Sequence, residues 1–246
     1  MKILINEVST SYQKIGSSKN ILVMLHGWGC DWQIFAPVIP ELSKKYKLII
    51  PDLPCFGDSD CPTQSWDSYE YADWLAEFTN KVISSGKYSL LGHSFGGKIS
   101  AIFASQSSRQ ITKLILVDSS GLPDPLTIVQ QISKSTSRLI PSQVKNLIPS
   151  SFKKKVLARA GVATDHLNST PAQRKILKKI VRENITNDLI KIKTPALIIW
   201  GKNDADTPPY QGKEFHQLIK NSKFEVFENS GHFPFIDESE KFVDLI

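Results

Sequence analysis

Gly92-His93-Ser94-Phe95-Gly96-Gly97 gives the clearest indication of how this chain folds. An apolar run over residues 88–91 precedes it and predicts a short buried strand. Residues 98–104 follow it with apolar side chains at helical spacing. A G-x-S-x-G sequence between a strand and a helix predicts a nucleophile elbow, a sharp turn that exposes the serine hydroxyl at a helix N-terminus. The alternative is a glycine-rich turn with an incidental serine, because G-x-S-x-G alone is common by chance.

Short apolar runs alternate with helical patterns over most of the chain. An opening hairpin is expected over residues 2–7 and 9–14. The other predicted strands cover residues 21–25, 47–50, 113–117, 195–200 and 224–227. Helices are expected over residues 31–44, 67–84 and 237–246, with another beginning near Thr207-Pro208. This alternation is typical of βαβ units and predicts an α/β fold with a mostly parallel sheet.

The alternation stops at about residue 119. Residues 121–190 show only helical patterns, interrupted by proline and glycine. We expect these residues to form a helical cap, or lid, inserted into a core domain made of residues 1–120 and 191–246.

A serine nucleophile needs a base within hydrogen-bond reach, and that base needs an orienting acid. His232 is the preferred base, because it follows the last predicted strand at the edge where parallel sheets form their sites. The other histidines are His26 and His93 in tight turns, His166 in the expected cap and His216 in a predicted helix.

The acid should lie between the serine and the histidine in the chain. Asp204 fits best, because it enters a turn directly after a predicted strand. Asp206 is the nearest competitor, although it is also placed to cap the helix near Thr207-Pro208. Asp118, at the end of the preceding strand, is a less favoured acid.

The oxyanion formed by serine attack also needs hydrogen-bond donors. The main-chain N–H of Phe95, directly after the serine, is one expected donor. The N–H of Trp28, in the turn after an early buried strand, is the other. Trp28, Phe95 and Phe233 are also the candidates for substrate binding.

Several segments together resemble the α/β-hydrolase superfamily, and most closely its small cofactor-free esterase, C–C hydrolase and perhydrolase branches with a helical cap. They are residues 26–29, 51–59, 92–97, 200–204 and 231–233. The resemblance implies an α/β-hydrolase fold with an eight-stranded, mostly parallel sheet and the chain order Ser94, Asp204, His232. Cys55 stands where the family's D-x-P-G-x-G-x-S loop usually has glycine. The conformation of this loop is therefore not implied by the resemblance, whereas the triad is unaffected. Serine at the elbow argues against the haloalkane dehalogenase and epoxide hydrolase branches, which use aspartate there.

We therefore expect a serine hydrolase of the carboxylesterase type, which cleaves a small carboxylic ester through an acyl-enzyme intermediate. A lactone, a thioester or a C–C bond could be cleaved by the same residues. A small-ligand receptor that keeps the triad is the alternative from another class. Neither a cofactor nor a metal ion is expected.

Composition limits the class of protein and the cellular compartment in which it is expected. The chain has 246 residues, of which 41% are hydrophobic and 22% charged, as in ordinary globular proteins. No apolar run is long enough for a membrane span or a signal-peptide core. The three cysteines show no metal-ligand spacing, so we expect a reducing, cytoplasmic setting. Cys55 is expected to be a small buried residue rather than a nucleophile or a redox switch. The sequence leaves open whether the chain is a monomer or a homodimer.

Positive charge is concentrated in the expected cap. Residues 121–190 contain twelve Lys or Arg and four Asp or Glu, a net charge of +8 within a chain of net charge +6. A solvated outer face is the preferred interpretation, and attraction of anionic substrates or an anionic membrane surface is the alternative. Nucleic acid is not expected as a partner, because no aromatic residues interleave the basic runs.

Overall fold

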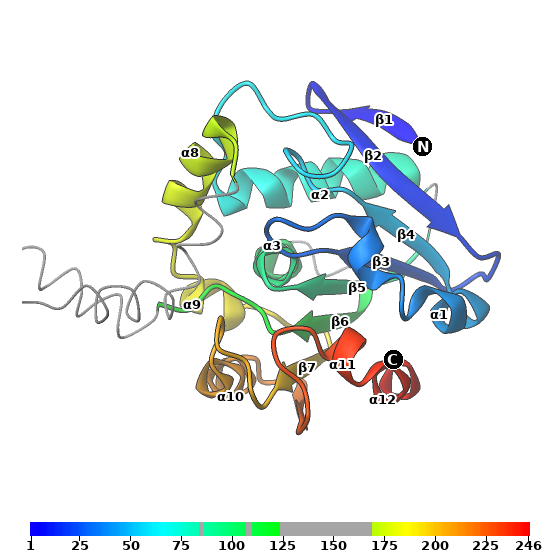
Figure 1. Ribbon diagram of the computed structural model, residues 1–246, viewed down its shortest axis with the longest axis vertical. Helices are drawn as coiled ribbons and strands as arrows, with labels where there is room; N and C mark the ends of the chain where they lie inside the picture. Colours follow the sequence, from blue (N-terminus) through cyan, green and yellow to red (C-terminus); the bar gives the residue numbers. More distant parts are fainter. Residues whose placement is uncertain (84–85, 107–109, 124–168) are drawn as a thin grey trace, which may run out of the picture.

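An eight-stranded sheet forms the centre of the computed structural model, which describes residues 1–83, 86–106, 110–123 and 169–246 (Figure 1). The spatial order of the strands is β1-β2-β4-β3-β5-β6-β7-β8. The two pairs that involve β2 are antiparallel and all other pairs are parallel, so the predicted mostly parallel sheet is confirmed. The strands are β1 (Lys2–Ile5), β2 (Val8–Ile15), β3 (Ile21–Leu25), β4 (Lys47–Pro51), β5 (Tyr88–His93), β6 (Ile111–Val117), β7 (Ala196–Gly201) and β8 (Ser222–Phe227).

Helices cover both faces of this sheet, and each face has its own apolar core. One core includes side chains of the short 3-10 helix η1 (Trp32–Phe35) and of the helices α1 (Ile39–Lys45), α11 (Pro234–Asp237) and α12 (Ser239–Leu245). The other core includes side chains of α2 (Ser68–Val82), α3 (Phe95–Gln106), α8 (Pro171–Ile180), α9 (Thr186–Leu189) and α10 (Pro209–Leu218). The central strands are therefore buried on both sides, which explains their nearly continuous apolar sequences.

One predicted helix is split in two, and another is preceded by a short helix that the sequence did not predict. Asp31 does cap a helix, because its side chain accepts the N–H of Gln33 at 2.7 Å, but that helix is only η1. Pro37 follows almost at once and has no N–H to donate to a helical hydrogen bond, and α1 starts separately at Ile39. The expected closing helix, residues 237–246, corresponds to α12. The short helix α11 precedes it, and the two are separated at Glu238, where φ is −130° and ψ is 55°.

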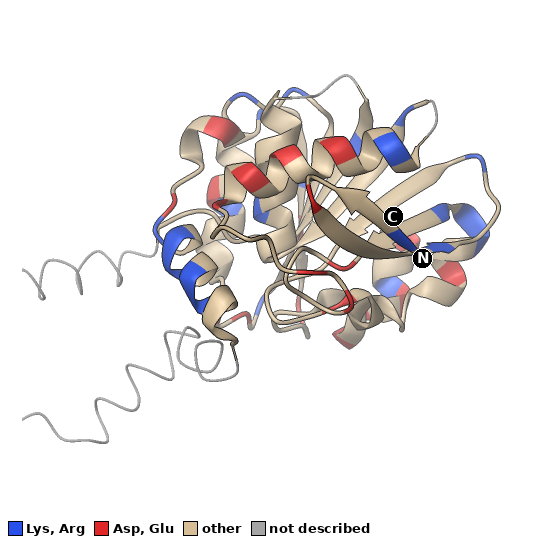
Figure 2. Ribbon diagram, turned by 90° about the horizontal axis from the view of Figure 1, so that it is seen from above, with Lys and Arg blue, Asp and Glu red and all other residues tan. Residues whose placement is uncertain are grey.

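Most of the expected cap, residues 124–168, lies outside the described residues. Its described end forms α8 and α9, and α8 buries Ile176, Leu177 and Ile180 against the core. The basic residues of α8 remain on its outer side, near the point where the grey trace rejoins the described chain (Figure 2).

A buried ion pair joins this segment to α3. Lys98 of α3 donates to the main-chain carbonyl of Ile180 at 2.6 Å and lies 3.4 Å from the Glu183 carboxylate. Burial lowers the pKa of Lys98, and the charge of Glu183 opposes that shift. Glu183 also accepts the N–H of Ser68 at 3.0 Å, so α2, α3 and the end of α8 are joined at one point.

Helices that cross a membrane must be long and predominantly apolar. No helix within the described ranges is long and apolar enough to cross a bilayer.

Candidate active site

Ser94 lies in a strained turn between β5 and α3, as the sequence predicts. Its φ is +51°, in the left-handed region that non-glycine residues rarely adopt. The turn packs closely against the end of β3. A Cβ at Gly96 would lie only 2.5 Å from the carbonyl oxygens of Leu25 and His26, so glycine is needed there. Strain of this kind persists only where the surroundings enforce it, and it is typical of functional sites.

Asp204 and His232 are brought together from the turns that follow β7 and β8. The ring Nδ1 of His232 lies 2.8 Å from Oδ2 of Asp204. The Asp204 side chain is fully buried, whereas that of His232 is 12% exposed. Asp206 is exposed and does not cap α10, and its main-chain N–H donates to Asp204 at 2.8 Å. The preferred acid therefore contacts the preferred base, and its competitor does not.

The surroundings of Asp204 favour its ionised form. Burial alone would raise its pKa, but hydrogen bonds and charge interactions outweigh burial, and the pKa is lowered. The donors are His232, the hydroxyl and main-chain N–H of Thr207, and the N–H of Asp206. An acid with these donors can hold the imidazole of His232 in one tautomer and orientation.

His93 anchors the loop that carries His232, a role that the sequence did not suggest. Its Nε2 donates to the main-chain oxygen of His232 at 2.7 Å, and the two ring centroids are 4.8 Å apart. Burial lowers the pKa of His93 well below its usual range, so the ring is neutral. Because His93 directly precedes Ser94, this contact joins the serine turn to the histidine loop.

Aromatic side chains pack around the expected oxyanion donors. The Trp28 ring lies edge-on to Phe56 at 4.8 Å and to Phe95 at 5.7 Å. Phe95 also contacts Tyr71 at 5.1 Å and is only 3% exposed, so its side chain belongs mainly to the core. Phe95 opens α3, so its N–H belongs to the helix's first turn and has no acceptor within the helix. The Trp28 ring is partly exposed, as is Phe233, which contacts the rings of His93 and His232.

A third acid, Asp118, lies beside Asp204 and His232. Among the described residues these three form the group that could supply metal ligands, with the atoms concerned all within 4.8 Å of one another. Both oxygens of Asp204 already accept hydrogen bonds from protein donors. We therefore interpret the group as a hydrogen-bonded network rather than a metal centre.

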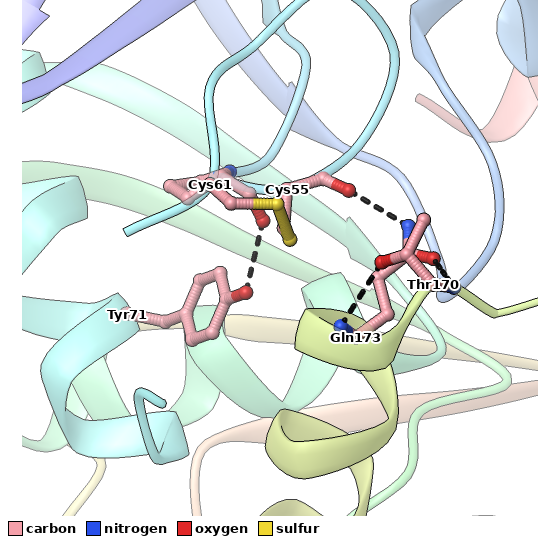
Figure 3. Close-up of a disulfide and its surroundings, with 6 residues drawn as sticks. Cys55, Cys61, Tyr71, Thr170 and Gln173 are labelled. Carbon is pink, nitrogen blue, oxygen red and sulfur yellow. Dashed lines mark hydrogen bonds between the residues drawn. A yellow bond between two sulfur atoms is a disulfide. The ribbon is translucent and has the colours of Figure 1, made fainter. Parts of the chain in front are cut away.

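Cys55 and Cys61 form a disulfide, so the expectation of a reduced cysteine is wrong for this pair (Figure 3). The chain turns back between them, and the N–H of Cys55 donates to the carbonyl of Asp60 at 2.9 Å. Cys55 has a φ of +76°, so it adopts the left-handed conformation that suits the glycine usual in this loop. The pairing was not predictable from spacing, because disulfide connectivity depends on the path of the loop.

The disulfide loop is tied to helices on both sides of it (Figure 3). The Tyr71 hydroxyl of α2 donates to the carbonyl of Pro54 at 2.9 Å. The side-chain amide of Gln173, in the first turn of α8, donates to the carbonyl of Cys55 at 2.8 Å. Phe56 follows in the same loop and contacts Trp28, so this loop supports one of the expected oxyanion donors.

The two remaining histidines of the described residues have other hydrogen-bond partners. His26 is buried, and its Nε2 accepts the N–H of Leu53 at 2.9 Å. His216 is exposed on α10 and lies 2.8 Å from the hydroxyl of Ser222. His166 lies outside the described residues.

Comparisons with known proteins point to one family. A family model described as "Alpha/beta hydrolase family" matches residues 22–245. The chain is 27% identical over 244 residues to a pimeloyl-[acyl-carrier protein] methyl ester esterase of Nitrosomonas europaea, which covers 90% of this chain and 92% of the relative. It is 24% identical over 261 residues to a 2-hydroxy-6-oxo-2,4-heptadienoate hydrolase of Pseudomonas putida, and the match covers 99% of this chain and 93% of the relative. An esterase from Exiguobacterium antarcticum has a similar solved structure, with a TM-score of 0.77, 25% identity and coverage of 99% and 96%.

Proposed function

Because the chain belongs to the alpha/beta hydrolase family, we propose that it is a serine hydrolase that cleaves a small carboxylic ester. The observation that carries this proposal is the 2.8 Å contact between His232 and Asp204. Ser94 supports it from its strained strand-to-helix turn, because the preceding residue, His93, is hydrogen-bonded to the main chain of His232. An esterase among the relatives supports the same reaction class.

The proposed reaction uses three side chains in sequence. Asp204 holds His232 by accepting its Nδ1–H, so the Nε2 of His232 takes the proton of the Ser94 hydroxyl as that oxygen attacks the ester carbonyl. The main-chain N–H groups of Trp28 and Phe95 stabilise the oxyanion. Collapse of the tetrahedral intermediate breaks the ester bond, and His232 gives its proton to the leaving alcohol. The acyl-enzyme is then hydrolysed by water, which His232 activates in the same way.

We propose the same division of the chain as the sequence suggests. Residues 1–120 and 191–246 supply the sheet and the reacting groups, and residues 121–190 form a cap that shapes the acyl pocket together with Trp28 and Phe233. The contacts of Gln173 with the Cys55 loop and of Lys98 with Glu183 support a cap that is fixed to the core at its C-terminal end.

A C–C bond hydrolase is the second candidate, since a relative is named as a dienoate hydrolase. A lactone or thioester substrate would use the same groups, and a receptor that retains the triad is the alternative from another class. Turnover of a panel of p-nitrophenyl esters, lactones, thioesters and vinylogous diketones separates these candidates. We expect burst release from a short p-nitrophenyl ester and its loss in Ser94→Ala, whereas a receptor would bind without turnover.

A further inference from the structure

Asp118 is a buried acid beside the triad that the proposed mechanism does not use. It continues β6 by one residue and is 0% exposed. Its carboxylate lies within 4.8 Å of the ligand atoms of Asp204 and His232. An acid so close to the base must affect it, either as a second negative charge or as a neutral hydrogen-bond donor.

Hydrogen bonding distinguishes the two acids. Asp204 accepts bonds from His232, Asp206 and Thr207 through both its oxygens. Asp118 accepts one bond at Oδ1, from the main-chain N–H of Gly201 at 2.9 Å. Its Oδ2 is buried, and no described residue donates a hydrogen bond to it. A buried ionised carboxylate with one donor is costly, whereas a proton on Oδ2 would turn that oxygen into a donor.

The charges lead to the same assignment. Two carboxylates at this separation in a buried site cannot both ionise cheaply, so one of them retains a proton. Burial raises the pKa of Asp118 well above its usual range, and the negative charge of Asp204 and a hydrogen bond to it act in the same direction. The pKa of Asp204 is shifted the opposite way.

We propose that Asp118 is a positioning residue of the triad. It carries a proton on Oδ2 and donates a hydrogen bond through that proton to the Asp204 carboxylate, while Asp118 itself stays neutral. Its Oδ1 meanwhile accepts the N–H of Gly201, the last residue of β7. The neutral acid adds one more donor to Asp204 without placing a second negative charge near His232. The inference rests on the proposed function for the roles of Asp204 and His232.

Two substitutions separate donation from charge. Asn at position 118 keeps an acceptor for Gly201 and a donor for Asp204, but it cannot ionise. Gly removes the carboxyl group altogether. Both residues tolerate the left-handed backbone of Asp118, whose φ is +42°, so backbone strain does not confuse the comparison.

The first measurement is the pH profile of kcat/KM on a p-nitrophenyl ester. We expect Asp118→Asn to keep kcat within about threefold of the wild type with an unchanged apparent pKa. Asp118→Gly should lose about 10- to 100-fold in kcat with little change in KM, because Asp204 is held less firmly. If Asp118 were ionised, Asp118→Asn would lower the apparent pKa by about one unit or more. That shift, a loss as large as in Asp204→Asn, or equal activity of the Asn and Gly variants would overturn the proposal.

The second measurement is thermal unfolding between pH 5 and 8, which needs no activity. An unfolded Asp loses its proton at about pH 3.9, whereas the folded chain would hold the Asp118 proton to higher pH. Asp118 therefore contributes a loss of stability to the wild type as pH rises through this window, and Asp118→Asn lacks that contribution. We expect the Tm of Asp118→Asn relative to the wild type to increase with pH. A pH-independent difference would show that Asp118 is ionised, whatever reaction the protein catalyses.

Discussion

The Nε2–H of His93 donates to the main-chain carbonyl of His232 at 2.7 Å, although 139 positions separate the two residues. The bond fixes the loop of the proposed base to the residue that precedes the proposed nucleophile. A shift of about 1 Å in such a group can cost on the order of 100-fold in rate.

We therefore expect His93→Leu to lower kcat by about 10- to 100-fold with little change in KM. His93→Gln is the matched control, because its side-chain amide can donate from nearly the same place and should keep most of the activity. Steady-state kinetics with circular dichroism of both variants checks this. Equal kcat values in the two folded variants would contradict the positioning role.

The triad assignment is tested by comparing two neighbouring acids. Ser94→Ala and His232→Ala should each lower kcat by about 1,000-fold or more. Asp204→Asn should be similarly severe, because Asp204 is buried against His232. Asp206→Asn should be mild, since its side chain is exposed and only its main chain contacts Asp204. A larger loss in Asp206→Asn would show that the acid is misassigned.

The pH dependence should have a single ascending limb. A general base must be neutral to accept a proton, and histidine ordinarily changes charge between pH 5 and 8, so kcat/KM should rise across that range. The lowered pKa of Asp204 keeps its carboxylate ionised throughout, so it adds no second limb there. A profile that stays flat from pH 5 to 9, with chemistry limiting, would exclude a histidine base.

Loss of the disulfide should affect stability more than catalysis. Closing a loop as short as that between Cys55 and Cys61 contributes about 2 kcal/mol on a chain-entropy estimate. Cys55→Ser should lower Tm and keep most of the activity. Cys55→Gly should lose less stability, because glycine suits the left-handed backbone at this position. Loss of covalent serine labelling in folded Cys55→Gly would instead show that the loop is needed to form the site.

The effect of the positive charge of α8 on anionic substrates can be tested with Lys→Glu substitutions. A pair of lysines on α8 is compared with a pair elsewhere on the surface. Lys175 and Lys178 are exposed on α8. Lys220 and Lys223 are exposed near the start of β8, whereas the proposed site lies beyond the C-terminal ends of β7 and β8. If the basic helix attracts anionic substrates, Lys175→Glu with Lys178→Glu should lower kcat/KM for an ester with a distal carboxylate. The pair Lys220→Glu and Lys223→Glu should not.

Salt supplies the control for that comparison. The effect should vanish at about 0.5 M salt, where the Debye length is a few ångströms, and a neutral ester of the same size should be unaffected. An identical response of the two esters would mean that the basic residues only solvate the surface.

The sequence predicted those parts of the fold that local patterns determine. The elbow at Ser94 and the strands of the sheet were found because glycine spacing and apolar runs directly reflect a tight turn and burial on two faces. The helix expected from Asp31 was too long. The prediction followed the helical pattern through Pro37, whereas the structure has two separate helices on either side of that proline.

The parts of the site that the sequence did not reveal depend on contacts between distant segments. His93 appeared to be only a turn residue, because its partner is a carbonyl on another strand's loop. The Cys55–Cys61 bond depends on a loop path that spacing does not fix. Asp118 was weighed only as a rival acid, since a supporting role emerges only from its contact with Gly201 and its proximity to Asp204.

The pairing of β6 with β7 also has a consequence for how the protein refolds. Val117 and Ile199 are partners in adjacent parallel strands, although a long stretch of chain separates them. Closing such a long loop costs entropy before any contact is gained, so pairings of this kind form slowly. Asp118 and Asp204 lie just beyond these two strands, so the site spans this seam. Recovery of catalytic activity after denaturation should therefore lag behind the recovery of helical signal, and activity would report the last long-range step of folding.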